Sequence, residues 1–213
     1  MGAKTWIIVY SNSDIPSLWL HKPKPKKENL AQILNALFPK KNFVEIESGN
    51  LAFTNPRSRE VQIADLGELL IVATDAVALD YPSKVPQHFI DYSDYKYIYV
   101  FAMHSVVDWF AFAIWENKQL IRSLSLSPDL GIMEDIGEKL SFEQDFWSGK
   151  CPAVDPEDDE DTYPLPFHPL DFGENALLNL MGYQYEGLIA LNKVDPEEIE
   201  MACFKSQAWW KFW

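Results

Sequence analysis

Three apolar, β-rich segments follow one another closely between residues 95 and 127, and this spacing constrains the fold more than any other feature of the sequence. They read YKYIYVFAM, DWFAFAIW and QLIRSLSLS, and the last two meet at the turn-forming residues Glu116–Gln119. A turn this short joins antiparallel strands, because parallel strands need a much longer crossover. In Asp108–Trp115, the side chains that point to each face of the strand are mostly apolar, which is typical of a central strand covered on both faces. The segments therefore predict a mostly antiparallel sheet.

Other segments predict the elements around this sheet. Thr5–Tyr10 and Leu69–Thr74 have the composition of short buried strands, and alternation on both sides of SGN predicts a hairpin over 43–55. Residues 30–38 place apolar side chains at i, i+3, i+4, i+7 and i+8, which indicates an amphipathic helix. Because no repeat and no shift in composition divides the chain, we expect a single α+β domain over 1–213, with a few short helices flanking the sheet.

The composition is strongly acidic. Lysine and arginine number 18 against 32 aspartate and glutamate residues, which gives a formal net charge of −14. An acidic chain repels the phosphate backbone of nucleic acids, so we expect no nucleic-acid partner, and the lysines of HKPKPKKENL are expected in a solvated loop. The charge instead favours a basic protein partner.

Several sequence signals are absent. The chain shows no secretory leader pattern and no apolar run near the roughly 18–20 residues that span a bilayer, so we expect a cytoplasmic protein without a membrane partner. Cys151 and Cys203 lack CxxC spacing and the four histidines are scattered, so we expect reduced thiols and no metal site of the zinc type. No glycine-rich phosphate-binding motif is found, and we expect no cofactor.

His104, Ser105 and Asp108 lie within the most apolar stretch of the chain. In a catalytic triad, serine is the nucleophile, histidine is the general base, and aspartate orients the histidine. However, adjacent residues of a strand point to opposite faces, and no GxSxG elbow surrounds Ser105. We therefore favour a hydrogen bond between His104 and Asp108 that organises the turn between two strands, with a catalytic or ligand-binding role as the alternative.

Polar clusters follow three of the predicted strands. They contain Ser11, Asn12 and Asp14; Thr74, Asp75 and Asp80; and His104, Ser105 and Asp108. If these strands were parallel, their carboxyl ends would gather the clusters at one sheet edge, and Asp14, Asp75 and Asp80 would be candidate ligands for a cation or a substrate. The alternative is that these are ordinary polar strand ends.

Two further segments are candidates for partner contact. The acidic loop at about 153–162 contains Asp158, Asp159 and Glu160, and it lacks the glycine and the alternating ligands of a calcium loop. The aromatic tail at 208–213 contains Trp209, Trp210 and Trp213. Exposed aromatic residues are typical interface anchors. The alternative for the acidic segment is a solvated loop without a partner, and the alternative for the aromatic tail is that it folds back over the core.

Four segments carry a resemblance. GAKTW with VYS, AMHSVVDWFAFAIW, LSLSPDLGIMEDIGEKLSFE and YPLPFHPLDFGE resemble an uncharacterised bacterial family that is known as a domain of unknown function. The likeness covers nearly the whole chain and implies a stand-alone cytosolic bacterial protein. It implies no activity, no cofactor and no catalytic residue.

Two classes of function follow. We expect an acidic binding protein, most concretely an immunity or inhibitor protein that neutralises a basic toxin, because the chain is acidic and lacks a recognisable catalytic motif. The alternative is a hydrolase or metal-dependent enzyme in which His104 acts as the general base and Asp108 orients it. Whether the chain is an enzyme stays open, and the absence of a motif favours a binding role.

Overall fold

The computed structural model describes residues 3–92, 94–154, 163–186 and 188–207. In this part of the chain, nine strands form one antiparallel sheet in the order β2-β9-β3-β4-β1-β5-β6-β7-β8. The strands are β1 (Lys4–Ser11), β2 (Phe43–Asn50), β3 (Glu60–Asp65), β4 (Leu69–Ala73), β5 (Tyr97–His104), β6 (Trp109–Glu116), β7 (Gln119–Ser127), β8 (Gly131–Gly137) and β9 (Glu200–Ser206). The predicted α+β fold with a central antiparallel sheet is confirmed.

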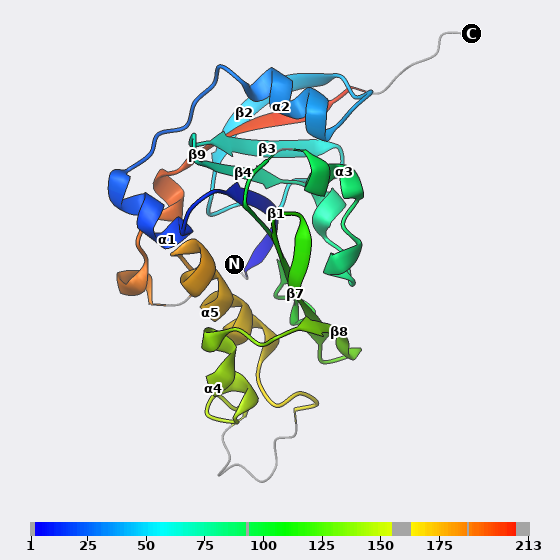
Figure 1. The fold of residues 1–213 in the computed structure, drawn as a ribbon, viewed down its shortest axis with the longest axis vertical. Helices are drawn as coiled ribbons and strands as arrows, with labels where there is room; N and C mark the ends of the chain where they lie inside the picture. The colour runs from blue at the N-terminus through cyan, green and yellow to red at the C-terminus, as the bar shows by residue number, and fades with distance from the viewer. Residues whose placement is uncertain (1–2, 93, 155–162, 187, 208–213) are drawn as a thin grey trace, which may run out of the picture.

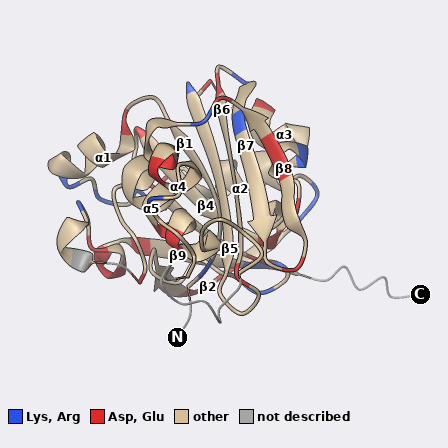
Figure 2. Cartoon of the chain, turned by 90° about the horizontal axis from the view of Figure 1, so that it is seen from below, with Lys and Arg blue, Asp and Glu red and all other residues tan. Residues whose placement is uncertain are grey.

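Short helices flank the sheet (Figure 1). The α-helices are α1 (Ile15–Leu18), α2 (Leu30–Leu37), α3 (Gln87–Asp91), α4 (Gln144–Trp147) and α5 (Pro169–Met181). The 3-10 helices are η1 (Trp19–His21), η2 (Asp75–Val77), η3 (Pro82–Lys84), η4 (Ser141–Glu143), η5 (Ile189–Leu191) and η6 (Pro196–Glu198). Among the described residues, no helix is long and apolar enough to cross a membrane. Most charged side chains lie on helices and connections rather than along the central strands (Figure 2).

The sheet separates two hydrophobic clusters. Ile7 and Val9 of β1 point into the cluster that contains α1, α4 and α5, whereas Ile8 and Tyr10 point into the cluster that contains α2 and α3. Because alternate residues of a strand face opposite sides, a strand covered on both sides is apolar at every position. This explains the unbroken apolar run of β1.

Helix α5 packs closely on the centre of the sheet. A Cβ on Gly173 would lie 2.7 Å from Phe110 Cδ2 and 2.9 Å from Met103 Sδ, which real Cβ atoms do not approach. The missing side chain is therefore what allows the helix to contact β5 and β6 at this distance. Any larger residue at this position would push α5 away from the sheet.

The hairpin predicted over 43–55 is wrong. Ser48, Gly49 and Asn50 belong to a single strand, β2, which pairs with β9 and carries a register shift between Ile46 and Gly49. The turn-forming residues therefore produce a bulge, because the partner strand comes from the C-terminal part of the chain.

A buried ion pair joins β7 to the segment that follows β8. The Arg122 guanidinium donates from Nε to Glu143 Oε1 at 2.8 Å and from a terminal nitrogen to Glu143 Oε2 at 2.7 Å, and both side chains are fully buried. A second terminal nitrogen donates to Asp135 Oδ1 at 2.5 Å. The Glu143 carboxylate also accepts hydrogen bonds from the Leu140 backbone and the Trp147 indole. Such satisfied bidentate pairs are geometrically specific.

We expect Glu143→Gln to lower the free energy of unfolding by about 3 kcal/mol, because it leaves the buried Arg122 charge without its main counterion. Urea denaturation measures this change. The matched control is Glu138→Gln, at an exposed position, which should change stability by less than about 0.5 kcal/mol. Equal stability of the two variants would contradict a structural role for the pair.

Candidate functional site

The direction of three neighbouring strands decides which polar clusters meet. β1 lies between β4 and β5 and is antiparallel to both, so β4 and β5 run in the same direction. Their carboxyl ends therefore reach the same edge of the sheet, where the segment after β4 supplies Asp80 and β5 supplies His104. The carboxyl end of β1 lies at the opposite edge, because Ser11 pairs with the first residues of β4 and β5. Two of the three predicted clusters are adjacent and the third is not.

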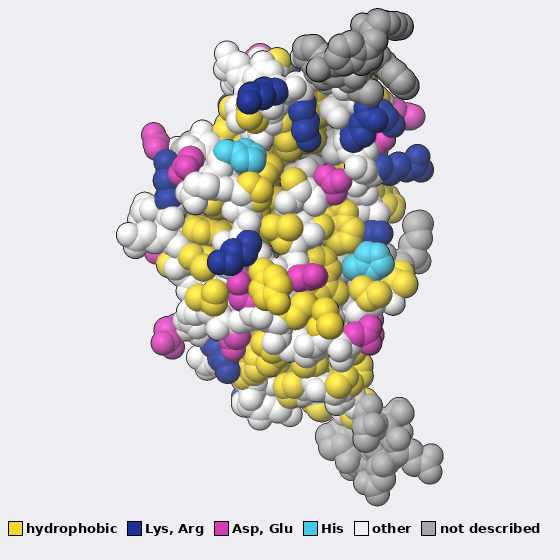
Figure 3. Space-filling view, turned by 90° about the vertical axis from the view of Figure 1, so that its right-hand side faces the viewer, with side chains coloured by type: hydrophobic (Ala, Val, Ile, Leu, Met, Phe, Trp, Pro, Cys, Tyr) yellow, Lys and Arg dark blue, Asp and Glu magenta, His cyan; other side chains and the backbone are white. Residues whose placement is uncertain are grey.

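Asp80 and His104 line a pocket of about 580 Å³. Its other lining residues are Trp6, Ala78, Val107, Trp109, Ser127, Asp129 and Leu130. We call it the aromatic pocket. Leu130 and Val107 are exposed at its rim, with relative accessibilities of 67% and 48%. Figure 3 shows hydrophobic side chains spread over the face of the molecule that carries α3 and β8.

Three rings form the wall of the aromatic pocket. The ring centroids of Trp6 and His104 lie 5.8 Å apart with an interplanar angle of 17°, and those of Trp6 and Trp109 lie 6.2 Å apart. Alanines at 102 and 111 lie with Trp109 in one small buried cluster, and they leave room for the large rings. The Trp109 indole also donates to Ser125 Oγ at 3.2 Å, which holds its orientation.

The environment of His104 favours the uncharged form of its imidazole. Burial lowers the pKa of His104, and the positive charge of Lys4, its partner across the strand pair, lowers it further. Nδ1 is buried and has no hydrogen-bond partner among the described residues.

Asp108 does not pair with His104 in the described part of the chain. Its Oδ2 lies 3.5 Å from Nε2 of His168, the residue that caps α5, and His168 Nδ1 accepts a hydrogen bond from the Leu170 backbone. The expected His104–Asp108 hydrogen bond is therefore replaced by a contact to α5. The physical reason is the sheet itself, because α5 packs on one face and the ring of His104 stacks on Trp6 at the other.

The remaining candidates do not assemble a catalytic centre. Ser105 donates its backbone N–H to Ala3 and does not line the aromatic pocket. Asp75 is exposed at the start of η2, and Asp14 caps α1 at the opposite sheet edge. No group of three or more His, Cys, Asp or Glu side chains within the described residues is placed to hold a metal ion.

The predicted partner-contact residues lie outside the described residues. These are Asp158, Asp159, Glu160, Trp209, Trp210 and Trp213. Their roles stay predictions.

Sequence reasoning missed three residues of the aromatic pocket. Trp6, Trp109 and Asp129 come from three different parts of the chain. Trp109 directly follows the HSVVD segment, and this proximity to His104 in the sequence could have indicated that it lies in the pocket. No local pattern indicated Trp6, because its contact with His104 depends on the register between β1 and β5.

We expect Lys4→Gln to raise the pKa of His104, because removing a neighbouring positive charge favours the protonated imidazole. An NMR titration of the imidazole signals measures the change. The matched control is Lys22→Gln, an exposed lysine that does not appear among the causes of the shift, and it should leave the titration unchanged. An unchanged titration in Lys4→Gln would contradict the assigned cause.

Comparison with protein-family models matches residues 5–204 to a family of unknown function (DUF6928). No curated protein and no solved structure matches the chain significantly.

Proposed function

The chain belongs to the DUF6928 family of unknown function, and we propose that it is a binding protein whose aromatic pocket holds a basic side chain of a protein partner. In its most specific form, the proposal is a cytoplasmic immunity or inhibitor protein that binds and neutralises a basic toxin. The observation that carries it is the lining of the pocket. Trp6 and Trp109 line the same pocket as Asp80 and Asp129, and none of its described lining residues is a lysine or arginine.

The faces of tryptophan rings attract cations. A guanidinium or ammonium group over the face of an indole is stabilised by the ring quadrupole, and nearby carboxylates add hydrogen-bond acceptors. The Lys4 ammonium lies 5.2 Å from the Trp6 ring centre, outside the pocket lining, so the protein itself places a cation against this ring. The lowered pKa of His104 favours its uncharged form, which does not repel a cation in the pocket.

The rim of the pocket supports a protein partner rather than a free small cation. Val107 and Leu130 are exposed residues of the lining, and Tyr81 follows Asp80 with 52% of its surface accessible. Exposed apolar residues around a pocket that receives one anchoring side chain are typical of protein interfaces. The net charge of −14 would speed encounter with a basic protein.

A hydrolytic role for the same pocket is the second candidate. The observation that favours it is that His104 lines the pocket and that burial and Lys4 lower its pKa, which favours the basic form of the imidazole. Among the described residues, however, His104 lacks the hydrogen bond to Asp108 that would orient it as a general base. His104→Ala distinguishes the two roles, because it would abolish hydrolysis but only weaken the binding of a cation.

We expect Asp80→Asn combined with Asp129→Asn to weaken the binding of the peptide acetyl-Gly-Arg-Gly-amide roughly fivefold, because each exposed carboxylate contributes a modest ion pair. Titration followed by the indole N–H NMR signals of Trp6 and Trp109 measures the affinity at the pocket itself.

The matched control variant is Asp94→Asn, at an exposed aspartate outside the pocket that pairs with Lys118. The matched control ligand is the same peptide with citrulline, the neutral analogue of arginine. Binding that is equal for both peptides, or that is unaffected by the double variant, would show that the pocket does not select a cation.

We expect arginine-peptide binding to weaken as the pH falls below about 6.5, because the pKa of His104 is lowered from this ordinary value and the protonated imidazole then adds a cation to the pocket. Lys4 on β1 is the charged group that lowers this pKa, and Asp80 and Asp129 line the same pocket. Titrations at several pH values test this, and His104→Gln should remove the part of the pH response that the imidazole causes. An identical pH response in the wild type and in His104→Gln would contradict it.

A further inference from the structure

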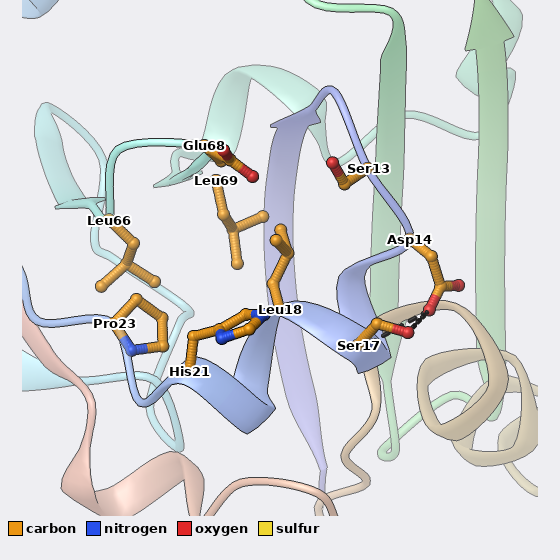
Figure 4. A pocket seen from close by; sticks show the side chains of 9 residues that line it. All are labelled: Ser13, Asp14, Ser17, Leu18, His21, Pro23, Leu66, Glu68 and Leu69. Atoms are coloured by element: carbon orange, nitrogen blue, oxygen red, sulfur yellow. Dashed lines mark hydrogen bonds between the residues drawn. The ribbon is translucent and has the colours of Figure 1, made fainter.

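A second cavity lies at the opposite edge of the sheet, where β1 ends. Its volume is about 550 Å³, and Figure 4 shows its lining. The residues are Ser13, Asp14, Ser17, Leu18, His21, Pro23, Leu66, Glu68 and Leu69. We call it the β1-end cavity. It shares no lining residue with the aromatic pocket.

Both walls of this cavity are held in place by the fold. On one wall, Asp14 Oδ2 accepts hydrogen bonds from the Ser17 backbone and hydroxyl, and the buried Trp19 indole donates to the Met181 carbonyl at 2.6 Å. On the other wall, the turn between β3 and β4 is closed by a hydrogen bond from the Leu66 backbone to the Leu69 carbonyl at 2.8 Å. The cavity is therefore preformed and does not depend on a ligand to order it.

The floor of the cavity is apolar. Leu66 and Leu69 are buried in the core beneath it, and the partly buried Leu18 lies between them and the Asp14 side (Figure 4). Such a surface favours a hydrocarbon chain, because burying each methylene removes apolar area from water.

The polar groups of the cavity include the exposed carboxylate of Glu68. Glu68 makes no hydrogen bond or ion pair with another described residue, whereas Asp14 is already used by Ser17. The Glu68 carboxylate and the Ser13 hydroxyl lie on the same side of the cavity, above the leucines (Figure 4). Among the described residues, the lining contains no lysine or arginine, and the Lys26 ammonium lies 3.1 Å from where a Cβ on Gly67 would be, outside the lining.

We propose that the β1-end cavity binds an aliphatic primary amine, with the ammonium group at Glu68 and the hydrocarbon chain on Leu18, Leu66 and Leu69. Ser13 supplies a further acceptor for the ammonium group, and His21 borders the end of the hydrocarbon chain. This is a small-molecule site, and it is independent of the proposed protein-binding role of the aromatic pocket.

The experiment compares n-hexylamine, 1-hexanol and hexanoate, which share one hydrocarbon chain and differ in charge. Binding is followed by the methyl NMR signals of Leu18 and Leu69, which report on this cavity alone. We expect hexylamine to bind with a dissociation constant on the order of millimolar and hexanoate at least about tenfold more weakly. Equal affinity for the amine and the carboxylate would overturn the proposal.

Variants complete the test. Glu68→Gln should weaken hexylamine binding roughly fivefold and leave hexanol binding unchanged, because only the ion pair is lost. Glu138→Gln, at an exposed carboxylate outside the cavity, should change neither. The Asp80→Asn, Asp129→Asn protein should give the same hexylamine signal at Leu18 and Leu69, which separates this cavity from the aromatic pocket. An unchanged affinity in Glu68→Gln would overturn the proposal.

Discussion

The pairing of β1 with β4 on one side and β5 on the other is the constraint on which the rest of the structure depends. Both pairings are antiparallel, so the two flanking strands run in the same direction and end at one edge of the sheet. That edge carries the aromatic pocket, and the opposite edge carries the β1-end cavity. A parallel pairing on either side would have moved His104 or Asp80 to the other edge. The positions of both cavities are therefore consequences of strand direction.

The two faces of the sheet are covered by different helices and differ in their packing. One face is covered by α1, α4 and α5, where close packing at Gly173 and the buried pair of Arg122 and Glu143 fix the helical segments. The other face is covered by α2 and α3, and near the end of β5 small residues leave room for the rings of Trp6 and Trp109. Buried ion pairs specify geometry more than they add stability. On the other face, Trp109 is buried and Trp6 is half-buried, and both rings line the aromatic pocket.

Much of the fold could be predicted from local patterns in the sequence. The close spacing of β5, β6 and β7 and the short turn at residues 116–119 predicted their antiparallel order, and the periodicity of residues 30–38 predicted α2. The hairpin prediction at 43–55 failed because the partner of β2 is β9, about 150 residues later in the sequence, and nothing local reports such a pairing. His104 and Asp80 were predicted as candidates, but Trp6 and Asp129 were not, because they reach the pocket only through strand register and a distant turn.

By itself, the sequence determined the kind of sheet, the residues that its buried strands offer to the core, and the acidic character of the chain. Those properties follow from side-chain periodicity, turn chemistry and summed charge, which act over short distances in the chain or need no structure at all. Only the tertiary structure decided that His104 lines one pocket with two tryptophans and Asp80, and that Asp108 instead lies near His168. The physical reason is that a sheet assigns neighbouring residues to opposite faces, so side chains close in sequence are separated and distant ones are brought into contact.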